Sequence, residues 1–193
     1  RPSARRSAAR TGIRWFTETD VSVADDSELL DLLAASGCRQ VLIGLESPEA
    51  EGLEGIDPHN WKMARCGRYL EAIDRIQSRG VSVNGCFVLG LDTHTPDIFE
   101  RVRDFVLRSG LLEVQITVQT PFPGTPLHAR LRREGRLLWE RFWERCTLFD
   151  VTFRPKHMTV AELESGLRWL FAEIYNEDEF LRRKRHYMEI VKE

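Results

Sequence analysis

The sequence of 193 residues contains few cysteines, and none of them lie close together. Cys38, Cys66, Cys86 and Cys146 never occur in CxxC or CxxxC spacing, and the five histidines form no HxH or HxxxH pair. Structural metal sites usually draw on such local pairs. A chain of this length can also build a core without disulfides. We therefore expect free thiols in a reducing cytoplasm and no metal site made by this chain alone.

Long apolar runs and an excess of one charge are also lacking. The longest apolar stretches, such as Val41–Leu45, have the length of strands, whereas a membrane helix needs about 20 residues. The formal net charge is −2, so the charge balance does not favour nucleic acid or a membrane surface as a partner. Residues 1–12 differ from the rest because they carry several arginines and no acid. We interpret them as a basic leader or linker.

The middle of the chain repeats one unit, in which a helical pattern ends at a glycine and an apolar strand follows. Helices are predicted near residues 25–36, with Ser22 or Asp25 as the cap, 61–79 and 96–109. Strands are predicted over residues 13–21, 40–47, 82–90 and 113–120. Strands alternating with helices predict a parallel α/β sheet. Four strands are half of a closed barrel, so the chain is either a small open domain or part of a larger barrel.

The pattern changes after Thr120. A turn-rich segment, a charged helix near 127–134 and an edge strand or hairpin arm over 148–154 are predicted. Thr159 with Glu162 predicts a capping box at the start of a helix that runs to about residue 175. The last helix, near 179–191, carries the run Arg182–Arg185, which we interpret as a solvated face. Three tryptophans are interpreted as core or interdomain packing: Trp139, Trp143 and Trp169.

Polar residues or glycine lie at or just after the carboxyl end of each predicted strand, where ligands bind in parallel sheets. These strand ends are Glu18 and Asp20, Glu46 and Ser47, Gly90 with Asp92, and Thr120 with Pro121. Gly85 and Gly90 indicate close approach of another group to a strand, either a flat ring such as adenine or a packed helix. No lysine follows the two glycines as in a P-loop, and no GxSxG surrounds Ser47.

Several motifs in a fixed order resemble the radical S-adenosylmethionine (SAM) superfamily, and most closely the branch that often carries a cobalamin-binding domain. The resemblance covers residues 13–176, and its motifs are WFTETD (15–20), DSELL (26–30), GCRQVLIGLES (37–47), GCFVLGLDTHTP (85–96), TPFPGTPL (120–127), EGR (134–136) and FRP (153–155). It implies a partial TIM-type (β/α) barrel over residues 13–127, made of family strands three to six. A mainly helical C-terminal extension would occupy residues 128–193.

The resemblance also implies ligands. Glu46, Ser47, Gly85, Gly90, Gln115, Thr117, Thr120 and Pro121 match positions that border SAM in the family, and Glu18, Asp20 and Asp92 would face the substrate. The family's CxxxCxxC loop, which holds a [4Fe–4S] cluster, does not occur in this sequence. The chain then resembles the SAM- and substrate-binding half of an enzyme whose missing N-terminal half or partner subunit supplies the cluster, with cobalamin as an optional further cofactor.

Three hypotheses stay open at this point. The complete protein would perform hydrogen abstraction or methyl transfer on a small molecule or lipid, and this half would be inactive alone. Alternatively, the chain is a non-catalytic binding or scaffold subunit, or a complementing half-barrel. No motif in residues 137–193 names a substrate.

Overall fold

The computed structural model describes residues 12–191, so most of the predicted leader, residues 1–11, lies outside the described residues. Four parallel strands form one open sheet in the order β1-β2-β3-β4. They are β1 (Trp15–Thr19), β2 (Cys38–Glu46), β3 (Ser82–Leu89) and β4 (Glu113–Val118). The predicted α/β fold with a partial, unclosed barrel is confirmed, and each strand ends within two residues of its predicted position.

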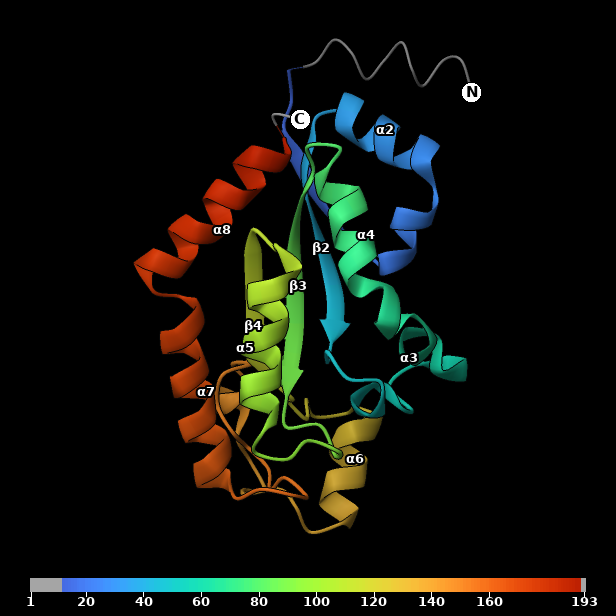
Figure 1. Cartoon of the computed structure of the whole chain (residues 1–193). Coiled ribbons are helices and arrows are strands. Elements are labelled where there is room, and N and C mark those ends of the chain that lie inside the picture. Colours follow the sequence, from blue (N-terminus) through green and yellow to red (C-terminus); the bar gives the residue numbers. More distant parts are fainter. Residues whose placement is uncertain (1–11, 192–193) are drawn as a thin grey trace.

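Helices α2 (Ser27–Ala35), α4 (Tyr69–Gln77) and α5 (Ile98–Ser109) connect successive strands. They cover one face of the sheet, and Figure 1 shows the arrowheads of β2 and β3 pointing toward α6 (Pro126–Arg133). Alternate strand residues face these helices and are fully or nearly buried, such as Ile43, Phe87 and Ile116. The residues between them are only half-buried. Because side chains alternate along a strand, the second face of the sheet remains open to a ligand or a partner.

Two helix starts differ from the sequence prediction. Asp26, not Ser22 or Asp25, caps α2, because its carboxylate accepts a hydrogen bond from the backbone N–H of Leu29. Asp20 instead caps a 3₁₀ helix, η1 (Val21–Asp25), that fills the space before α2. Two acidic residues at adjacent turns can each serve as a cap, and the sequence pattern alone does not choose between them.

The helix predicted over residues 61–79 is broken into three pieces. They are α3 (Trp61–Arg65), a 3₁₀ turn η4 (Cys66–Arg68) and α4. Gly67 lies in the break, where the absence of a side chain weakens a helix. After the break Tyr69 is buried, whereas Leu70 is 40% exposed.

The C-terminal part wraps around the end and one side of the sheet. Besides α6 it contains the 3₁₀ turn η5 (Trp143–Arg145), α7 (Val160–Ile174) and α8 (Glu177–Ile190). Two further 3₁₀ turns, η2 (Glu51–Leu53) and η3 (Pro58–Asn60), lie between β2 and α3. The capping box of Thr159 and Glu162 is confirmed. Residues 148–154 form no strand. Their one β-type contact is an antiparallel bridge between Phe153 and Leu137, which lies outside the four-stranded sheet.

The outer edge of β4 is covered by the helices that follow it. The Tyr175 hydroxyl accepts a hydrogen bond from the Ile116 amide and donates one to the Val114 carbonyl, at 3.2 and 3.0 Å. Arg183 is 3% exposed and donates to the Ile174 and Leu112 carbonyls. The prediction that Arg182–Arg185 form a solvated face is therefore wrong at Arg183, whose guanidinium satisfies carbonyls at the end of α7 and before β4.

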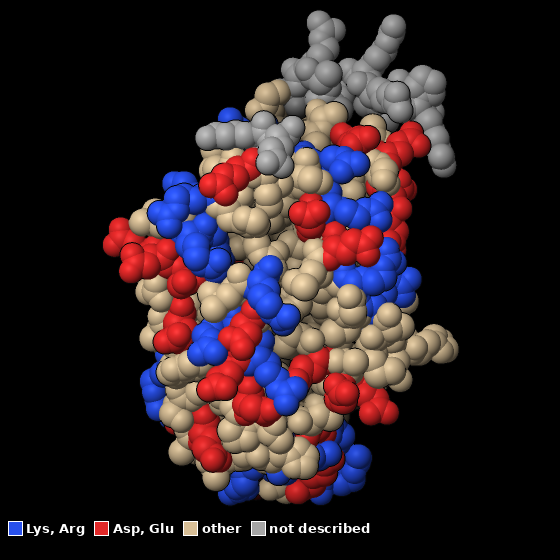
Figure 2. All heavy atoms as spheres, viewed as in Figure 1, with Lys and Arg blue, Asp and Glu red and all other residues tan. Residues whose placement is uncertain are grey.

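Acidic and basic side chains are interspersed over the face shown in Figure 2, without a large field of one sign. No helix within residues 12–191 is long and apolar enough to cross a membrane.

Candidate functional site at the carboxyl ends of the strands

A cavity of about 520 Å³ lies where the strands end. It is lined by the end of β2, by residues 52–56, by the loop after β3 and by α6, including Glu46, Val88, Asp92, Gln119 and Arg130. Small-molecule sites commonly have volumes of about 300–1,000 Å³. The cavity is therefore large enough for a cofactor at the edge where parallel sheets bind ligands.

Glu46 reaches this cavity through an unusual backbone. Its φ is 64°, in the left-handed region that side-chain-bearing residues rarely adopt. The β2–β3 register also skips one residue between Gly44 and Glu46, which is a β-bulge. The carboxylate is held by the Lys62 ammonium at 2.5 Å, and the same ammonium donates to the Gly44 carbonyl at 3.0 Å. The β-bulge and the ion pair with Lys62 together fix the Glu46 carboxylate at the carboxyl end of the sheet.

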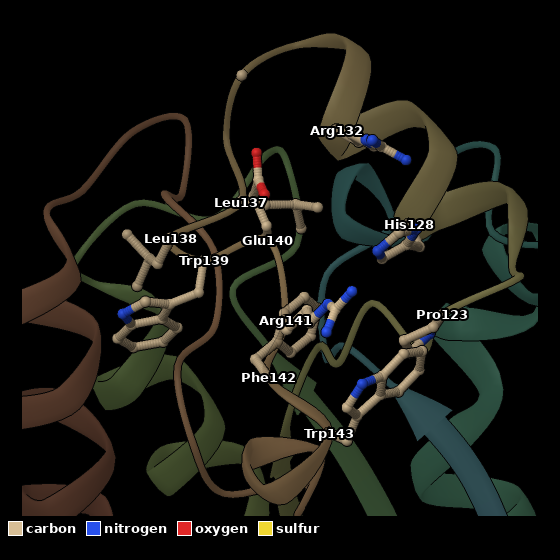
Figure 3. Close-up of a pocket in the computed structure, with 11 residues that line it drawn as sticks. Pro123, His128, Arg132, Leu137, Leu138, Trp139, Glu140, Arg141, Phe142 and Trp143 are labelled. Carbon is tan, nitrogen blue, oxygen red and sulfur yellow. The ribbon is translucent and has the colours of Figure 1, made fainter.

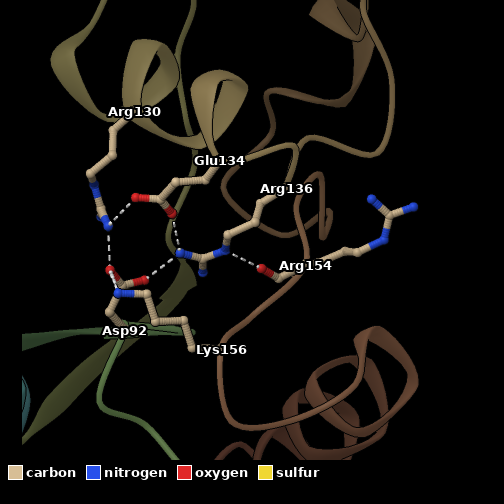
Figure 4. Close-up of polar contacts among 6 residues, drawn as sticks. All are labelled: Asp92, Arg130, Glu134, Arg136, Arg154 and Lys156. Atoms are coloured by element: carbon tan, nitrogen blue, oxygen red, sulfur yellow. Dashed lines mark hydrogen bonds and ion pairs between the residues drawn. The ribbon is translucent and has the colours of Figure 1, made fainter.

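Asp92 lies at the same rim within a group of cations (Figure 4). Arg130 contacts its carboxylate, Arg136 lies 2.9 Å from it and Lys156 lies 3.0 Å from it. Burial alone would raise the pKa of Asp92, but the hydrogen bonds from Arg130, Lys156 and Arg136 hold the pKa well below its usual range. Asp92 is thus a permanently charged anchor that ties α6 and the following loops to the end of β3.

Cys86 lies in the middle of β3 on the open face of the sheet. Burial raises the pKa of its thiol to about 11, with a further contribution from the Glu46 and Glu18 carboxylates. The thiol therefore stays protonated at neutral pH, whereas metal binding and nucleophilic attack require the thiolate. Within residues 12–191 no three His, Cys, Asp or Glu side chains come together as a metal site.

The space beside the two strand glycines, Gly85 and Gly90, is filled by side chains of neighbouring elements. A Cβ on Gly85 would lie 2.7 Å from the Leu111 side chain, and one on Gly90 would lie 3.0 Å from Phe153 and Leu163. Gly90 also has a φ of +84°. Of the two interpretations left open for these glycines, the contacts favour close packing of neighbouring elements.

The other predicted residues are spread around the same end of the sheet. Ser47 is fully buried beneath Gly52, where a Cβ would lie 2.5 Å from its hydroxyl. The Thr117 hydroxyl donates a hydrogen bond to the Phe87 carbonyl, and the Thr120 hydroxyl donates one to the Val118 carbonyl. Both hydroxyls therefore hydrogen-bond to the backbone. Gln115 pairs across from Cys86 on the open face, Pro121 is buried after β4, and Glu18 is exposed on β1. Only Glu46 and Asp92 of the predicted set line the cavity.

Sequence reasoning missed three groups at this end of the sheet: Gln119 and Arg130, which line the cavity, and Lys62, which pairs with Glu46. Gln119 follows β4, and its buried side-chain oxygen has no hydrogen-bond partner within the described chain. Its position one residue before Thr120, at a strand end, was a usable signal. Lys62 and Arg130 lie on helices far along the chain from Glu46 and Asp92, and no local pattern reveals such pairs.

Sequence comparisons link the chain to known methyltransferases. Residues 125–193 match the family described as a domain of unknown function, DUF4070. The hopanoid C-2 methylase of Rhodopseudomonas palustris is 32% identical over 132 residues, which cover 67% of this chain and 24% of that protein. The bacteriochlorophyllide d C-12(1)-methyltransferase of Chlorobaculum tepidum is 23% identical over 175 residues, which cover 91% of this chain and 37% of that protein.

Solved structures share the fold. The radical SAM methyltransferase TsrM from Kitasatospora setae, solved with cobalamin and a [4Fe–4S] cluster bound, aligns with a TM-score of 0.54 and 23% identity over 69% of this chain and 25% of that one. Elp3 of Methanocaldococcus infernus aligns with a TM-score of 0.54 and 14% identity over 86% of this chain and 35% of that one.

Fold and cavity together define a section of a parallel α/β barrel with a cavity at the strand ends. The relatives and solved structures confirm the resemblance to the radical SAM superfamily that the motifs indicated. The chain spans about a quarter to just over a third of the length of the curated relatives named above.

Proposed function

We propose that residues 13–127 are the SAM- and substrate-binding half of a radical SAM methyltransferase barrel and that residues 128–193 are its mainly helical extension. The observation that carries this proposal is Glu46, which a β-bulge, a left-handed backbone and Lys62 together hold at the cavity. A strained backbone of this kind costs roughly 1–3 kcal/mol and is concentrated at functional sites. A carboxylate that only served the fold would not need it.

The lining groups fit SAM chemically. The Glu46 carboxylate and the unpartnered Gln119 oxygen can accept hydrogen bonds from the amine or hydroxyl groups of SAM. The open sheet face adds Gln115, whose amide can bind a polar group. This half would bind SAM and orient it against the substrate.

The iron–sulfur cluster does not fit the residues of this chain. The four cysteines are free, and Cys38 and Cys86 lie on different strands. Burial raises the pKa of each of the four thiols, which opposes the thiolate form that iron binds. The cluster would therefore be held by an N-terminal half or a partner subunit, and free thiols suit a cytoplasmic location. When bound, cluster and SAM would supply radical chemistry for methyl transfer, with cobalamin as a further cofactor.

SAM binding to the chain tests the proposal directly. We expect isothermal titration calorimetry to detect SAM binding and Glu46→Gln to weaken it at least tenfold. Glu71→Gln is the matched control, because Glu71 is an exposed acid on α4 that pairs only with neighbouring arginines. Circular dichroism would show that both variants fold. Absence of SAM binding, or equal affinities of Glu46→Gln and the control, would contradict the proposal.

Iron and sulfide content after anaerobic reconstitution tests the second part. We expect no stable cluster on the chain alone and a cluster when a protein carrying CxxxCxxC is added. A stable cluster on the chain alone would show that its dispersed cysteines, or those of two copies, converge.

A complementing half-barrel or a non-catalytic subunit is the second candidate. It is favoured by β1, which pairs only with β2 within residues 12–191 and thus offers a free edge to another strand. Co-purification with a cysteine-containing partner would support the complementing half-barrel. A cooperative melt together with SAM binding and no such partner would support the non-catalytic subunit.

A further inference from the structure

A second cavity, of about 600 Å³, lies on the other side of α6. We call it the outer pocket and define it by His128 and Arg132 of α6 together with Arg141, Phe142 and Trp143 (Figure 3). The strand-end cavity contacts α6 through Pro126, Leu127 and Arg130 instead. One short helix therefore separates two cavities, and different side chains serve each.

The outer pocket has aromatic rings in its wall, one of them buried and one exposed. Phe142 is 1% exposed, and the His128 ring stacks on it at 6.0 Å and 29°. The neighbouring Trp143 is 64% exposed, so the predicted core position is wrong, whereas the alternative of interdomain packing stays a prediction. Burial of a tryptophan contributes strongly to stability, so an exposed one beside a cavity indicates a surface for a ligand or a partner. Rings of this kind bind another flat ring by stacking.

The outer pocket is lined by two arginines whose positive charges are not neutralised by an ion pair within the described residues. The guanidinium groups of Arg132 and Arg141 form no ion pair or hydrogen bond with any residue that the structure describes. By contrast, Arg130, on the other side of the same helix, is paired with Asp92 and Glu134. Glu140 is the only acid among the residues that line the pocket, and Figure 3 shows it beside Leu137, whereas Arg141 lies beside Phe142. A guanidinium that has no partner can bind a carboxylate with two hydrogen bonds.

From these contacts we propose that the outer pocket binds a planar organic anion, namely an aromatic ring system that carries a carboxylate. The ring lies against Trp143 and the His128 ring, which Phe142 supports from beneath, and the carboxylate pairs with Arg141 or Arg132. The site is distinct from the strand-end cavity, because α6 lies between them. Its occupation therefore does not require that SAM binds.

Isothermal titration calorimetry with 2-naphthoate tests this proposal on the full chain. Two probes separate the two kinds of contact: 2-naphthamide keeps the planar ring without the charge, and cyclohexanecarboxylate keeps the charge without the planar ring. We expect 2-naphthoate to bind and each of the other two to bind about tenfold more weakly. No binding of 2-naphthoate at millimolar concentration, or equal binding of the amide, would overturn the proposal.

Variants locate the binding. Arg141→Gln and Trp143→Ala change exposed side chains, so they should fold normally, and we expect each to weaken 2-naphthoate binding about tenfold. Arg133→Gln is the matched control, because Arg133 is an exposed arginine of α6 that does not line the pocket. Glu46→Gln should leave 2-naphthoate binding unchanged, so failure of the SAM proposal is distinguishable from failure of this one. Wild-type affinity in both Arg141→Gln and Trp143→Ala would place the ligand elsewhere and overturn the assignment.

Discussion

His94 is 2% exposed in the loop after β3, and neither of its ring nitrogens has a hydrogen-bond partner within the described chain. Burial lowers the pKa of its imidazole to about 4, and the nearby Asp97 opposes that shift only in part. The folded protein therefore holds a neutral imidazole at every pH above that value. The ring lies close to Ser47 and Gly52, so its protonation would place a charge beneath the loop that follows β2.

We predict a stability change that follows from this pKa. An unfolded histidine titrates near 6.5, so between about pH 6.5 and pH 4 the unfolded chain binds more protons than the folded one at this site. The free energy of unfolding should then fall as the pH drops through this window, by up to about 3 kcal/mol, and be unaffected by His94 above it. Urea unfolding at several pH values measures the change.

His94→Gln should remove this part of the pH dependence, whereas His157→Gln should retain it because His157 is exposed. Subtracting the curve of each variant from that of the wild type cancels the other titrating groups. Identical pH profiles for the wild type and His94→Gln would show that the imidazole is not held neutral.

At the scale of helices and strands, Gly166 decides how closely α7 approaches α5. A Cβ at this position would overlap the Phe99 ring. Gly166→Ala should therefore force the two helices apart and lower the free energy of unfolding by about 1–3 kcal/mol, despite the better helix propensity of alanine.

Gly67→Ala is the matched control, since a Cβ on Gly67 meets no atom within 4 Å. It should change stability by less than about 0.5 kcal/mol. The double variant Gly166→Ala with Phe99→Leu should recover part of the loss, because the smaller side chain frees space for the new methyl group. Equal stability of Gly166→Ala and the wild type would mean that the helices can shift without cost.

Tyr175 protects the outer edge of β4 with its hydroxyl. Tyr175→Phe keeps the ring but leaves the Ile116 amide and the Val114 carbonyl without that partner. We expect a loss of about 1–2 kcal/mol and faster hydrogen exchange at the Ile116 amide. Tyr187→Phe should leave both quantities unchanged, because the Tyr187 hydroxyl has no hydrogen-bond partner within residues 12–191. Unchanged exchange at Ile116 in Tyr175→Phe would show that another group covers the edge.

Local chemistry was enough to predict most of these elements. Glycines 37, 80 and 110, whose φ values are all positive, follow the helices as the pattern indicated, and the capping box of Thr159 and Glu162 lies where its spacing placed it. The burial of Arg183 and the exposure of Trp143 were missed. Both depend on what the rest of the chain places against α8 and η5, and neither residue type reveals that by itself.

The candidate site shows the same division. Glu46 and Asp92 were predicted because each lies at or just after the end of a strand, and the carboxyl ends of parallel strands meet at one edge. Lys62 reaches Glu46 from 16 positions along the chain, and Arg130 reaches Asp92 from 38. Helix packing sets those distances. Pairing across them is a property of the folded chain that one sequence does not display.

At the scale of the whole molecule, the unpaired edge of the sheet at β1 is the surface most open to association with another chain. In the described part of the chain β1 pairs with β2 alone, and Phe16 is 67% exposed on it. Free strand edges with apolar side chains pair with other chains. The far edge, at β4, is covered by Tyr175 and by the carbonyl of Leu148, which accepts from the Val118 amide. The two edges therefore differ in what they can bind.

We predict that Phe16→Lys reduces self-association of the chain, because a lysine on an exposed edge strand opposes strand-to-strand pairing. Phe16 is mostly exposed, so the unfolding midpoint should barely change. Phe180→Lys on α8, where Phe180 is 45% exposed, is the matched control and should associate as the wild type does. Light scattering across a concentration series measures the effect. If both variants associate equally, the contact between chains does not involve Phe16. That result would argue against the free edge of β1 as the surface on which a complementing half-barrel docks.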